Sequence, residues 1–272
     1  MPGSVGIRAD SSFLSIAFGI MICYSSYLPE KSDIVNNAFI TGFVNCGFSL
    51  LSGITVFGII GFMMHQSGGT LPTKLSGVFL AFATLPEAVN QLPVMQTVVG
   101  VLFFLSLVCA GMSSEISISE TVVSGIMDKF SLSRKKVVTG YCLVAGLLSL
   151  VFTTGSGLLI LDIVDHFINN FNIVFAGLIE VILLGWFFSL RMVKDHIHPI
   201  SDFNVGAWWN FCIKVLTPIV LGVTAVQNLI GDIRTPYGDY SLAALATLGW
   251  GVWVAAVGLS LILSTVKWKQ PV

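Results

Sequence analysis

The chain has 272 residues, of which 55% are hydrophobic and only 10% are charged, and its formal net charge is −1. Soluble domains usually carry about 25% charged residues, so this composition excludes an ordinary soluble protein and indicates an integral membrane protein. The near-neutral charge comes with no basic patch, so we expect the lipid bilayer as surroundings and no nucleic acid as a partner.

The N-terminal segment is too short in apolar residues to form a complete span. Residues 1–12, MPGSVGIRADSS, lack the apolar core of a signal peptide and match no targeting segment. In the following run, residues 13–28, a polar side chain at Ser15 and a glycine at Gly19 interrupt the apolar residues. This pattern predicts a broken or half helix.

Six later segments are long enough to cross a bilayer, for which about 20 mainly apolar residues are needed. They are residues 34–64, 95–127, 137–154, 166–192, 207–231 and 241–266. Connections between them are short, which predicts one all-α, polytopic membrane domain over residues 13–272. The longest connection, 68–93, has an amphipathic centre and predicts a short helical hairpin on the outer face.

The basic residues predict the orientation of the spans. If residues 28–33 are cytoplasmic, most lysines and arginines fall on the inner side: Lys31, Lys129, Arg134, Lys135, Lys136, Arg191, Lys194, Lys267 and Lys269. Only Lys74 and Arg234 fall outside. This bias follows the positive-inside rule and predicts a multi-pass protein of the cytoplasmic membrane with a cytoplasmic C-terminus.

A polar cluster lies near the middle of the second span, where Ser113 and Ser114 precede Glu115, with Ser117, Ser119 and Glu120 close behind. Hydrocarbon solvates neither carboxylates nor clustered hydroxyls, so polar groups at this depth usually face a protein interior or a path for ions or substrate. We therefore expect transport rather than catalysis. An intramembrane enzyme using Glu115 or Glu120 is disfavoured, because no HExxH, GxSxG or paired Asp arrangement accompanies them.

The cysteines and histidines predict no metal centre. The five cysteines stand singly in apolar runs, without a CxxC pair. His196 and His198 form an HxH in a loop that offers no third ligand.

Several short motifs occur in one order along the chain. They are Ser15-Ile16-Ala17-Phe18-Gly19, Tyr24-Ser25-Ser26-Tyr27, Asp33-Ile34-Val35 leading to Asn45, Ala110-Gly111-Met112-Ser113-Ser114, Asp128 with Leu132-Ser133-Arg134-Lys135, and Asp165 followed by Glu180. In this order and spacing, the chain resembles the neurotransmitter:sodium symporters, in particular their bacterial amino-acid-transporting members. The resemblance runs from about Phe13 to the C-terminus and leaves residues 1–12 unmatched.

The resemblance implies the fold. In that family, two inverted five-helix repeats face each other, and the first helix of each is unwound at mid-membrane. The chain then corresponds to the second repeat, starting within the sixth helix, together with the last two of the family's twelve helices. A five-helix N-terminal half would be a missing partner.

The resemblance also implies two sodium sites. The carbonyl of Ala110 and the hydroxyls of Ser113 and Ser114 would bind one sodium ion, while the amide of Asn45 would bind another together with the substrate carboxylate. Two alternatives come from the residues themselves. The serines can bond back to their own helix or to a neighbour, and Asn45 can form an interhelical hydrogen bond.

The remaining implied positions concern substrate, chloride and gates. Ser15, Phe18 and Ile118 would line the substrate pocket; an apolar amino acid is the expected substrate, and ordinary core or lipid contacts are the alternative for Phe18 and Ile118. Ser49, four residues after Asn45 and on the same face, favours chloride as a further ion. Two acids match the gates of the family, Asp165 the outer one and Asp128 the inner one; solvated charges at helix ends are the alternative.

Taken with the resemblance, the sequence implies sodium-coupled symport of an amino acid, in a chain that holds about half of the site and is inactive alone. The alternative is a non-transporting half-transporter that associates with or regulates a separately encoded partner.

Overall fold

A computed structural model describes residues 17–66, 80–92, 94–238 and 240–268. Within these ranges the chain is helical and contains no strand. Six helices are long and apolar enough to cross a membrane: Ile34–His65, Gln96–Phe130, Arg134–Thr153, Gly157–Phe187, Ala207–Arg234 and Leu242–Thr265. The chain is therefore an all-α polytopic membrane protein, as its composition predicts.

The first described helix, α2, is short. It covers Ile20–Ser25 and follows a turn in which Ala17 and Gly19 both have positive φ, 69° and 73°. Glycine tolerates this backbone conformation, whereas alanine adopts it at a steric cost. Helix α2 is thus shorter than the half helix expected over 13–28, of which residues 13–16 lie outside the described part.

The first three spanning helices begin and end close to the predicted limits. They are α3 (Ile34–Gln66), α6 (Gln96–Phe130), and α7 (Arg134–Ser149) extended by the 3-10 turn η2 (Leu150–Thr153). In the connection expected as an outer hairpin over 68–93, the described part forms a π turn, η1 (Leu80–Thr84), that continues into α5 (Leu85–Asn90).

The fourth span differs from the expected 166–192. It starts at Gly157 and comprises α8 (Gly157–Phe167), the π turn η3 (Ile168–Asn172), α9 (Ile173–Ile182) and the π turn η4 (Leu183–Phe187). Its early polar residues lie inside the helix because Asp162 is buried and His166 pairs with another helix. The span ends where Phe188 adopts an extended conformation, before a separate helix α10 (Leu190–Ile197).

The last two spans are also built from consecutive segments. The fifth comprises α11 (Ala207–Phe211), the π turn η5 (Cys212–Leu216) and α12 (Thr217–Arg234). The sixth comprises α13 (Leu242–Ala244), the π turn η6 (Leu245–Trp250) and α14 (Gly251–Thr265). The expected limits, 207–231 and 241–266, differ from these only at their ends.

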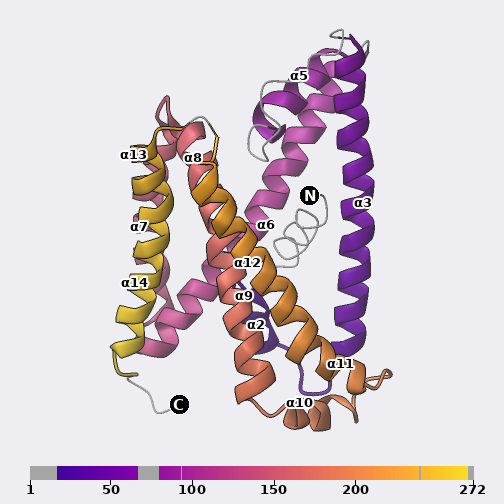
Figure 1. Cartoon of the computed structure of the whole chain (residues 1–272), viewed down its shortest axis with the longest axis vertical. Helices are drawn as coiled ribbons and strands as arrows, with labels where there is room; N and C mark the ends of the chain where they lie inside the picture. Colours follow the sequence, from indigo (N-terminus) through magenta and orange to yellow (C-terminus); the bar gives the residue numbers. More distant parts are fainter. Residues whose placement is uncertain (1–16, 67–79, 93, 239, 269–272) are drawn as a thin grey trace. The chain divides into compact units, whose positions relative to one another are not determined.

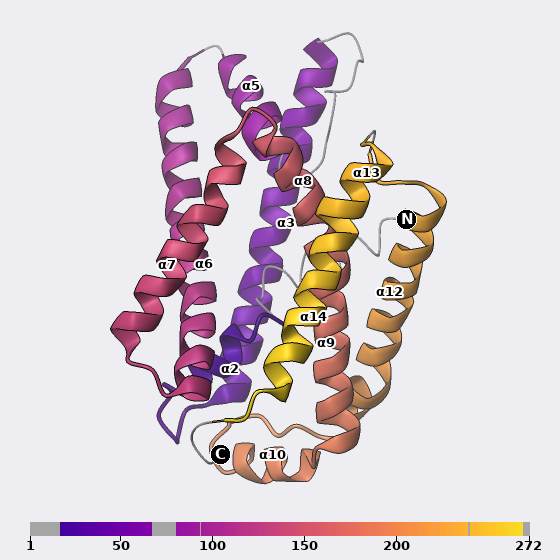
Figure 2. The ribbon, with the colours of Figure 1, turned by 90° about the vertical axis from the view of Figure 1, so that its left-hand side faces the viewer.

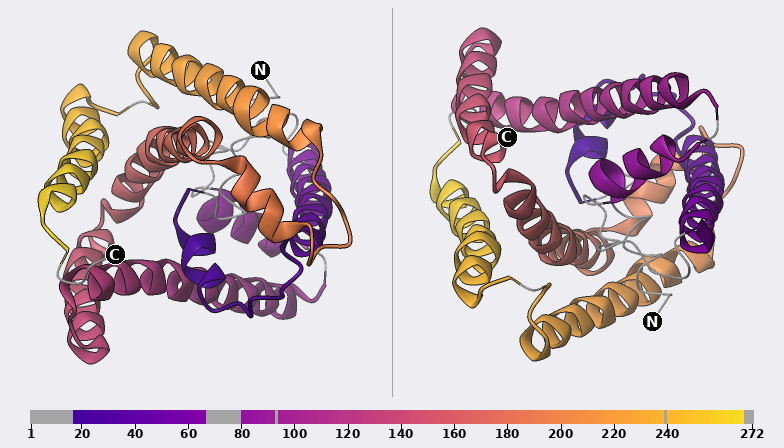
Figure 3. Two further views of the ribbon diagram at one scale, coloured as in Figure 1. Left: turned by 90° about the horizontal axis from the view of Figure 1, so that it is seen from below. Right: turned by 90° about the horizontal axis from the view of Figure 1, so that it is seen from above.

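The chain divides into two compact units, and the first combines residues 1–47 with 163–266. Here α12 packs along α9, as Figure 2 shows, while α10 lies across the ends of these helices. Seen from either end of the molecule, α14 and α12 both lie beside the helix that contains η3 and α9 (Figure 3). The core of this unit contains Phe167, Phe171 and Leu245, all at most 5% exposed.

The second unit combines residues 48–162 with 267–272. In it, α7 packs on α6, and α5 packs near the beginning of α6 (Figure 1). Large apolar side chains are exposed on both units; Phe57, for example, is 74% exposed. Such surfaces are costly in water but suit contact with lipid or with other membrane helices.

Candidate ion and substrate site

The two serines expected to bind sodium lie near the middle of α6, in the second unit. The hydroxyl of Ser113 donates a hydrogen bond to the carbonyl of Ala110 at 2.8 Å. Ser113, Ser114 and Ala110 are all exposed on the surface of this chain. The alternative of a bond back to the same helix is therefore realised at Ser113.

This bond still brings two of the expected ligand oxygens together. The Ala110 carbonyl also lies at the acceptor position for the backbone N–H of Ser114 within α6, so its two lone pairs are engaged, whereas the Ser113 oxygen keeps acceptor capacity. Oxygen atoms of this kind are what a hard cation prefers. Ser113 thus offers one oxygen with acceptor capacity, and the sodium site expected at Ala110, Ser113 and Ser114 stays a prediction.

The carboxylate of Glu115 has hydroxyl partners rather than a cation. Its Oε1 accepts hydrogen bonds from the Ser119 hydroxyl at 3.0 Å and the Tyr141 hydroxyl at 3.2 Å. Ser119 also lies 3.1 Å from the Tyr141 oxygen. Because Tyr141 belongs to α7, this group joins α6 to α7.

Glu120 forms a second link between the same helices. Two guanidinium nitrogens of Arg134, at the start of α7, donate to its two carboxylate oxygens at 2.8 and 2.6 Å. A bidentate pair of this kind fixes both distance and orientation. Glu120 therefore braces the packing of α7 on α6.

Asn45 and Ser49 both lie on α3. The side-chain nitrogen Nδ2 of Asn45 is buried and has no hydrogen-bond partner among the described residues. A buried amide nitrogen without a partner is costly, and the structure shows no interhelical bond from this nitrogen among the described residues. Its oxygen suits a cation, and its nitrogen would need an acceptor such as a carboxylate.

The expected substrate-lining residues are only partly described. Ser15 lies outside the described residues. Phe18 is half-buried within the Ala17–Gly19 turn, which packs against α9: a Cβ placed on Gly177 would lie 3.5 Å from Cβ of Ala17. Ile118 is half-buried on α6 and belongs to the other unit.

The two expected gate acids are both exposed. Asp165 accepts a hydrogen bond from the side-chain amide of Asn169 at 2.8 Å, within the same helix. Asp128 lies near the C-terminal end of α6.

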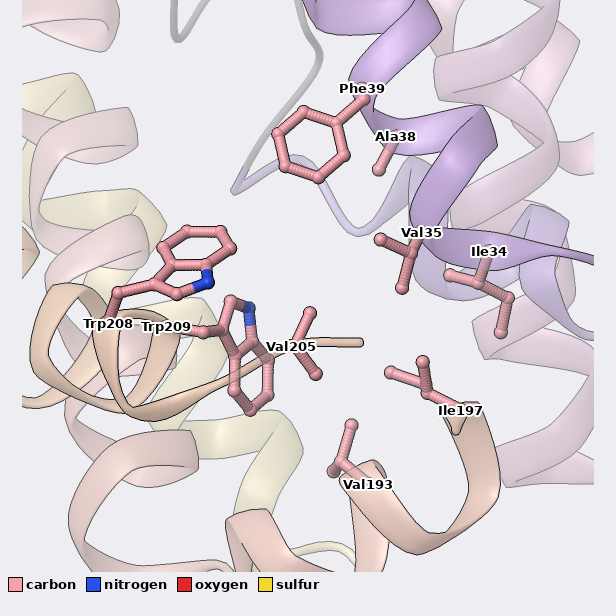
Figure 4. A pocket seen from close by; sticks show the side chains of 9 residues that line it. All are labelled: Ile34, Val35, Ala38, Phe39, Val193, Ile197, Val205, Trp208 and Trp209. Atoms are coloured by element: carbon pink, nitrogen blue, oxygen red, sulfur yellow. The ribbon is translucent and has the colours of Figure 1, made fainter. Parts of the chain in front are cut away.

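A cavity of about 390 Å³ lies in the first unit between α3, α10 and α11. Figure 4 shows Trp208 and Trp209 on one side of it and Val35 and Phe39 on the other. All nine lining side chains are apolar, and none belongs to the expected ion or substrate positions. This cavity suits an apolar group rather than an ion.

Sequence reasoning missed a polar cluster in the first unit, centred on His166. This histidine bonds to Asp232 and Asn170, although 66 residues separate it from Asp232. The available signal was the presence of ionisable residues inside apolar segments. Their pairing is invisible in a single sequence.

Comparisons with known proteins agree with the motifs. A family model described as the sodium:neurotransmitter symporter family matches residues 11–270. An uncharacterized sodium-dependent transporter of Methanocaldococcus jannaschii is 42% identical over 228 residues, which cover 84% of this chain and 46% of that protein.

Two animal proteins match almost the whole chain. The human sodium- and chloride-dependent neutral and basic amino acid transporter B(0+) is 32% identical over 94% of this chain and 40% of its own length. A sodium-dependent dopamine transporter of Caenorhabditis elegans is 29% identical over 93% of this chain and 42% of its own length. The chain thus spans less than half the length of these relatives.

Proposed function

Because the chain belongs to the sodium:neurotransmitter symporter family, we propose that it is the C-terminal portion of a sodium-coupled symporter for an amino acid. Its family is one of transporters rather than enzymes, and the structure is that of a multi-pass membrane protein. An apolar amino acid is the proposed substrate. The proposed orientation, from the lysine and arginine distribution, places the C-terminus in the cytoplasm.

The observation that carries the proposal is the match of the sodium:neurotransmitter symporter family model over residues 11–270. The Ser113 hydroxyl and the Ala110 carbonyl lie 2.8 Å apart in a long apolar helix. Together with Ser114 they are the proposed ligands of one sodium ion. Asn45, whose amide nitrogen is buried without a partner, is the proposed ligand of a second.

Coupling follows from this assignment. If the substrate carboxylate completes the Asn45 site, sodium binds more tightly when substrate is present. By thermodynamic linkage, substrate then binds more tightly when sodium is present. Phe18, Ile118 and Ser15 are the proposed pocket residues. Ser49 supports chloride as an additional ion, and Asp165 and Asp128 are the proposed gate acids.

Sodium-dependent amino-acid binding tests the serine assignment. We expect the Ser113→Ala, Ser114→Ala double variant to lose sodium-dependent binding, because two neutral oxygen ligands are removed from a site that has few. The measurement is binding of a labelled apolar amino acid with and without sodium, on purified chain reconstituted with a five-helix N-terminal half from a relative.

Ser106 offers a matched control on the same helix. Its hydroxyl bonds back to the Phe103 carbonyl at 2.8 Å, in the same manner as Ser113. Ser106→Ala should leave binding unchanged. Sodium-dependent binding that survives in the double variant removes Ser113 and Ser114 from the site.

A second candidate is a non-transporting half-transporter, which associates with a separately encoded partner or regulates a full-length relative.

A further inference from the structure

Helix α6 carries polar residues on two opposite sides. At 3.6 residues per turn, the direction midway between Ser113 and Ser114 lies roughly 170° around the helix from the direction midway between Glu115 and Ser119. The first pair belongs to the proposed sodium site. The second pair contacts Tyr141 on α7. The polar contact with α7 therefore lies on the back of α6, away from the proposed ligands.

Three oxygen atoms form this contact: Oε1 of Glu115, Oγ of Ser119 and the hydroxyl oxygen of Tyr141. They lie 3.0, 3.1 and 3.2 Å from one another. We call the three residues the Glu115 brace. Tyr141 thus meets α6 at two positions that are one helical turn apart. A rotation of α6 about its own axis would carry both oxygens away from Tyr141 and break both contacts together.

Apolar packing within this unit does little to fix the rotation of α6. Val123 alone is buried among the 35 residues of α6, and Val137 alone among the 16 of α7, both helices being described throughout. Val123 follows Ser119 by four residues and Val137 precedes Tyr141 by four, so each lies one turn from the brace on the same face. Lipid is as apolar as helix side chains, so apolar contacts between membrane helices provide little hydrophobic drive. Directional polar contacts are therefore what selects one rotation.

Small rotations of α6 matter at the proposed ligands. An atom about 5 Å from the helix axis moves by about 1 Å when the helix turns by about 10°. Binding sites need their ligand atoms held within about 0.5 Å. A rotation of this size would therefore displace the hydroxyls of Ser113 and Ser114 from the positions that a sodium ion requires.

We propose that Glu115, Ser119 and Tyr141 are positioning residues for the sodium site, on which they act without touching the ion. The brace fixes the rotation of α6 so that the hydroxyls of Ser113 and Ser114 point away from α7. This inference rests on the proposed function, because the site to be positioned is the sodium site proposed there.

A double-variant cycle in detergent tests the brace itself and needs no sodium. Ser119→Ala and Tyr141→Phe each remove one hydroxyl. We expect Ser119→Ala to raise the unfolding equilibrium constant roughly threefold more in the wild type than in Tyr141→Phe, the factor that an interhelical hydrogen bond contributes in a membrane protein. An equal effect in both backgrounds overturns the proposal, because Ser119 and Tyr141 then do not interact.

The sodium concentration that gives half-maximal amino-acid binding tests the positioning role. The chain is reconstituted with a five-helix N-terminal half from a relative, as for the serine variants. We expect Tyr141→Phe to raise this concentration roughly fivefold, with the same maximal binding per folded protein at saturating sodium. A merely structural role would lower the amount of folded protein and leave the half-saturating concentration unchanged. That result would overturn the proposal.

Two substitutions at Glu115 test whether its acceptor oxygen is what matters. Glutamine keeps a carbonyl oxygen to which Ser119 and Tyr141 can donate, and alanine does not. Glu115→Gln should therefore leave the half-saturating sodium concentration within about twofold of the wild type, whereas Glu115→Ala should raise it as Tyr141→Phe does. An equal rise in both Glu115 variants contradicts the brace.

Glu120→Gln is the matched control, because Glu120 also links α6 to α7. It lies six residues after Ser114, about 9 Å along the axis, and is held by Arg134. Its replacement should lower stability but keep the half-saturating sodium concentration within about twofold, since the brace still fixes the rotation. An effect as large as that of Tyr141→Phe would show a general packing role and overturn the assignment.

The wild type separates this inference from the proposed function. A wild type without sodium-dependent binding counts against the proposed function itself and removes the site that the brace would position. Sodium-dependent binding with one half-saturating concentration for the wild type and Tyr141→Phe counts against the positioning role alone.

Discussion

Asp33 immediately precedes α3, which begins at Ile34, and its carboxylate caps the helix. Oδ1 accepts a hydrogen bond from the backbone N–H of Asn36 at 3.1 Å, and Oδ2 lies 3.4 Å from the backbone nitrogen of Asp202. The Asn36 N–H is the main reason that the pKa of Asp33 lies below its usual value. The motif Asp33-Ile34-Val35 is visible in the sequence; the contact with Asp202 is not, because the two residues are 169 positions apart.

The lowered pKa of Asp33 predicts a pH-dependent contribution to stability. The folded chain binds this proton less readily than the unfolded chain. The ionised carboxylate therefore stabilises the fold above its ordinary value of 3.8, and this stabilisation is lost as pH falls through the lower folded value. Asp33→Asn should keep the cap but lose the charge. We expect the difference in thermal unfolding midpoint between the wild type and Asp33→Asn to shrink as pH is lowered.

Asp195→Asn is the control for this measurement. Asp195 is exposed and lies 3.9 Å from Arg191 in an i,i+4 pair, which contributes little. Its replacement should change the unfolding midpoint only slightly at any pH. A difference between the wild type and Asp33→Asn that stays constant from neutral pH to below 3.8 would contradict the linkage.

At the scale of helices, hydropathy predicts which segments span but not where a span with polar residues begins. The limits predicted for the second and sixth spans lie close to those of the structure. The fourth was expected from residue 166, whereas the helix starts at Gly157. A buried Asp162 and a histidine paired with Asp232 belong to the helix because of contacts made by distant parts of the chain.

Close packing between the fourth and sixth spans predicts the effect of one methyl group. A Cβ on Gly249, in η6, would overlap the ring of Phe167, which is only 2% exposed. We expect Gly249→Ala to lower the free energy of unfolding by about 1–3 kcal/mol, as overpacking does. Chemical denaturation in detergent measures the change.

Gly258 lies on the same spanning helix and provides the comparison. A Cβ there meets no atom within 4 Å. Gly258→Ala should be neutral or stabilise by up to about 1 kcal/mol, because alanine favours the helix. Equal stabilities of the two variants would show that Gly249 and Phe167 are not in close contact.

At the scale of the whole molecule, composition predicts the class and the six spans because a bilayer requires long apolar helices. The candidate site was predicted through short motifs and stays a prediction, since the bond from Ser113 to Ala110 is one within a single helix. The remaining ligands could not be assembled from sequence, because the proposed site needs residues of another half. The chain covers 46% of the archaeal relative and 40% of the human one.

Alternating access requires two states with different affinities, and one repeat alone builds neither. We therefore expect no sodium-driven amino-acid uptake into vesicles that contain this chain by itself. Co-reconstitution with a five-helix N-terminal half should restore uptake that depends on a sodium gradient.

Vesicles with a full-length relative test the regulatory alternative. If this chain only regulates, it should change the amino-acid uptake by that relative. Vesicles that contain this chain with an N-terminal half should then show no uptake. Uptake by the chain alone would contradict the requirement for a partner, and no effect in either pairing would exclude both roles.

The π turns described in the last three spans have an evolutionary consequence. A π turn closes its hydrogen bond one residue later than an α-helical turn, so each contains one residue more than a regular helix needs. The turns at Ile168–Asn172, Leu183–Phe187, Cys212–Leu216 and Leu245–Trp250 are thus places where a single-residue deletion restores a regular helix. Length differences between homologous spans should gather at these turns.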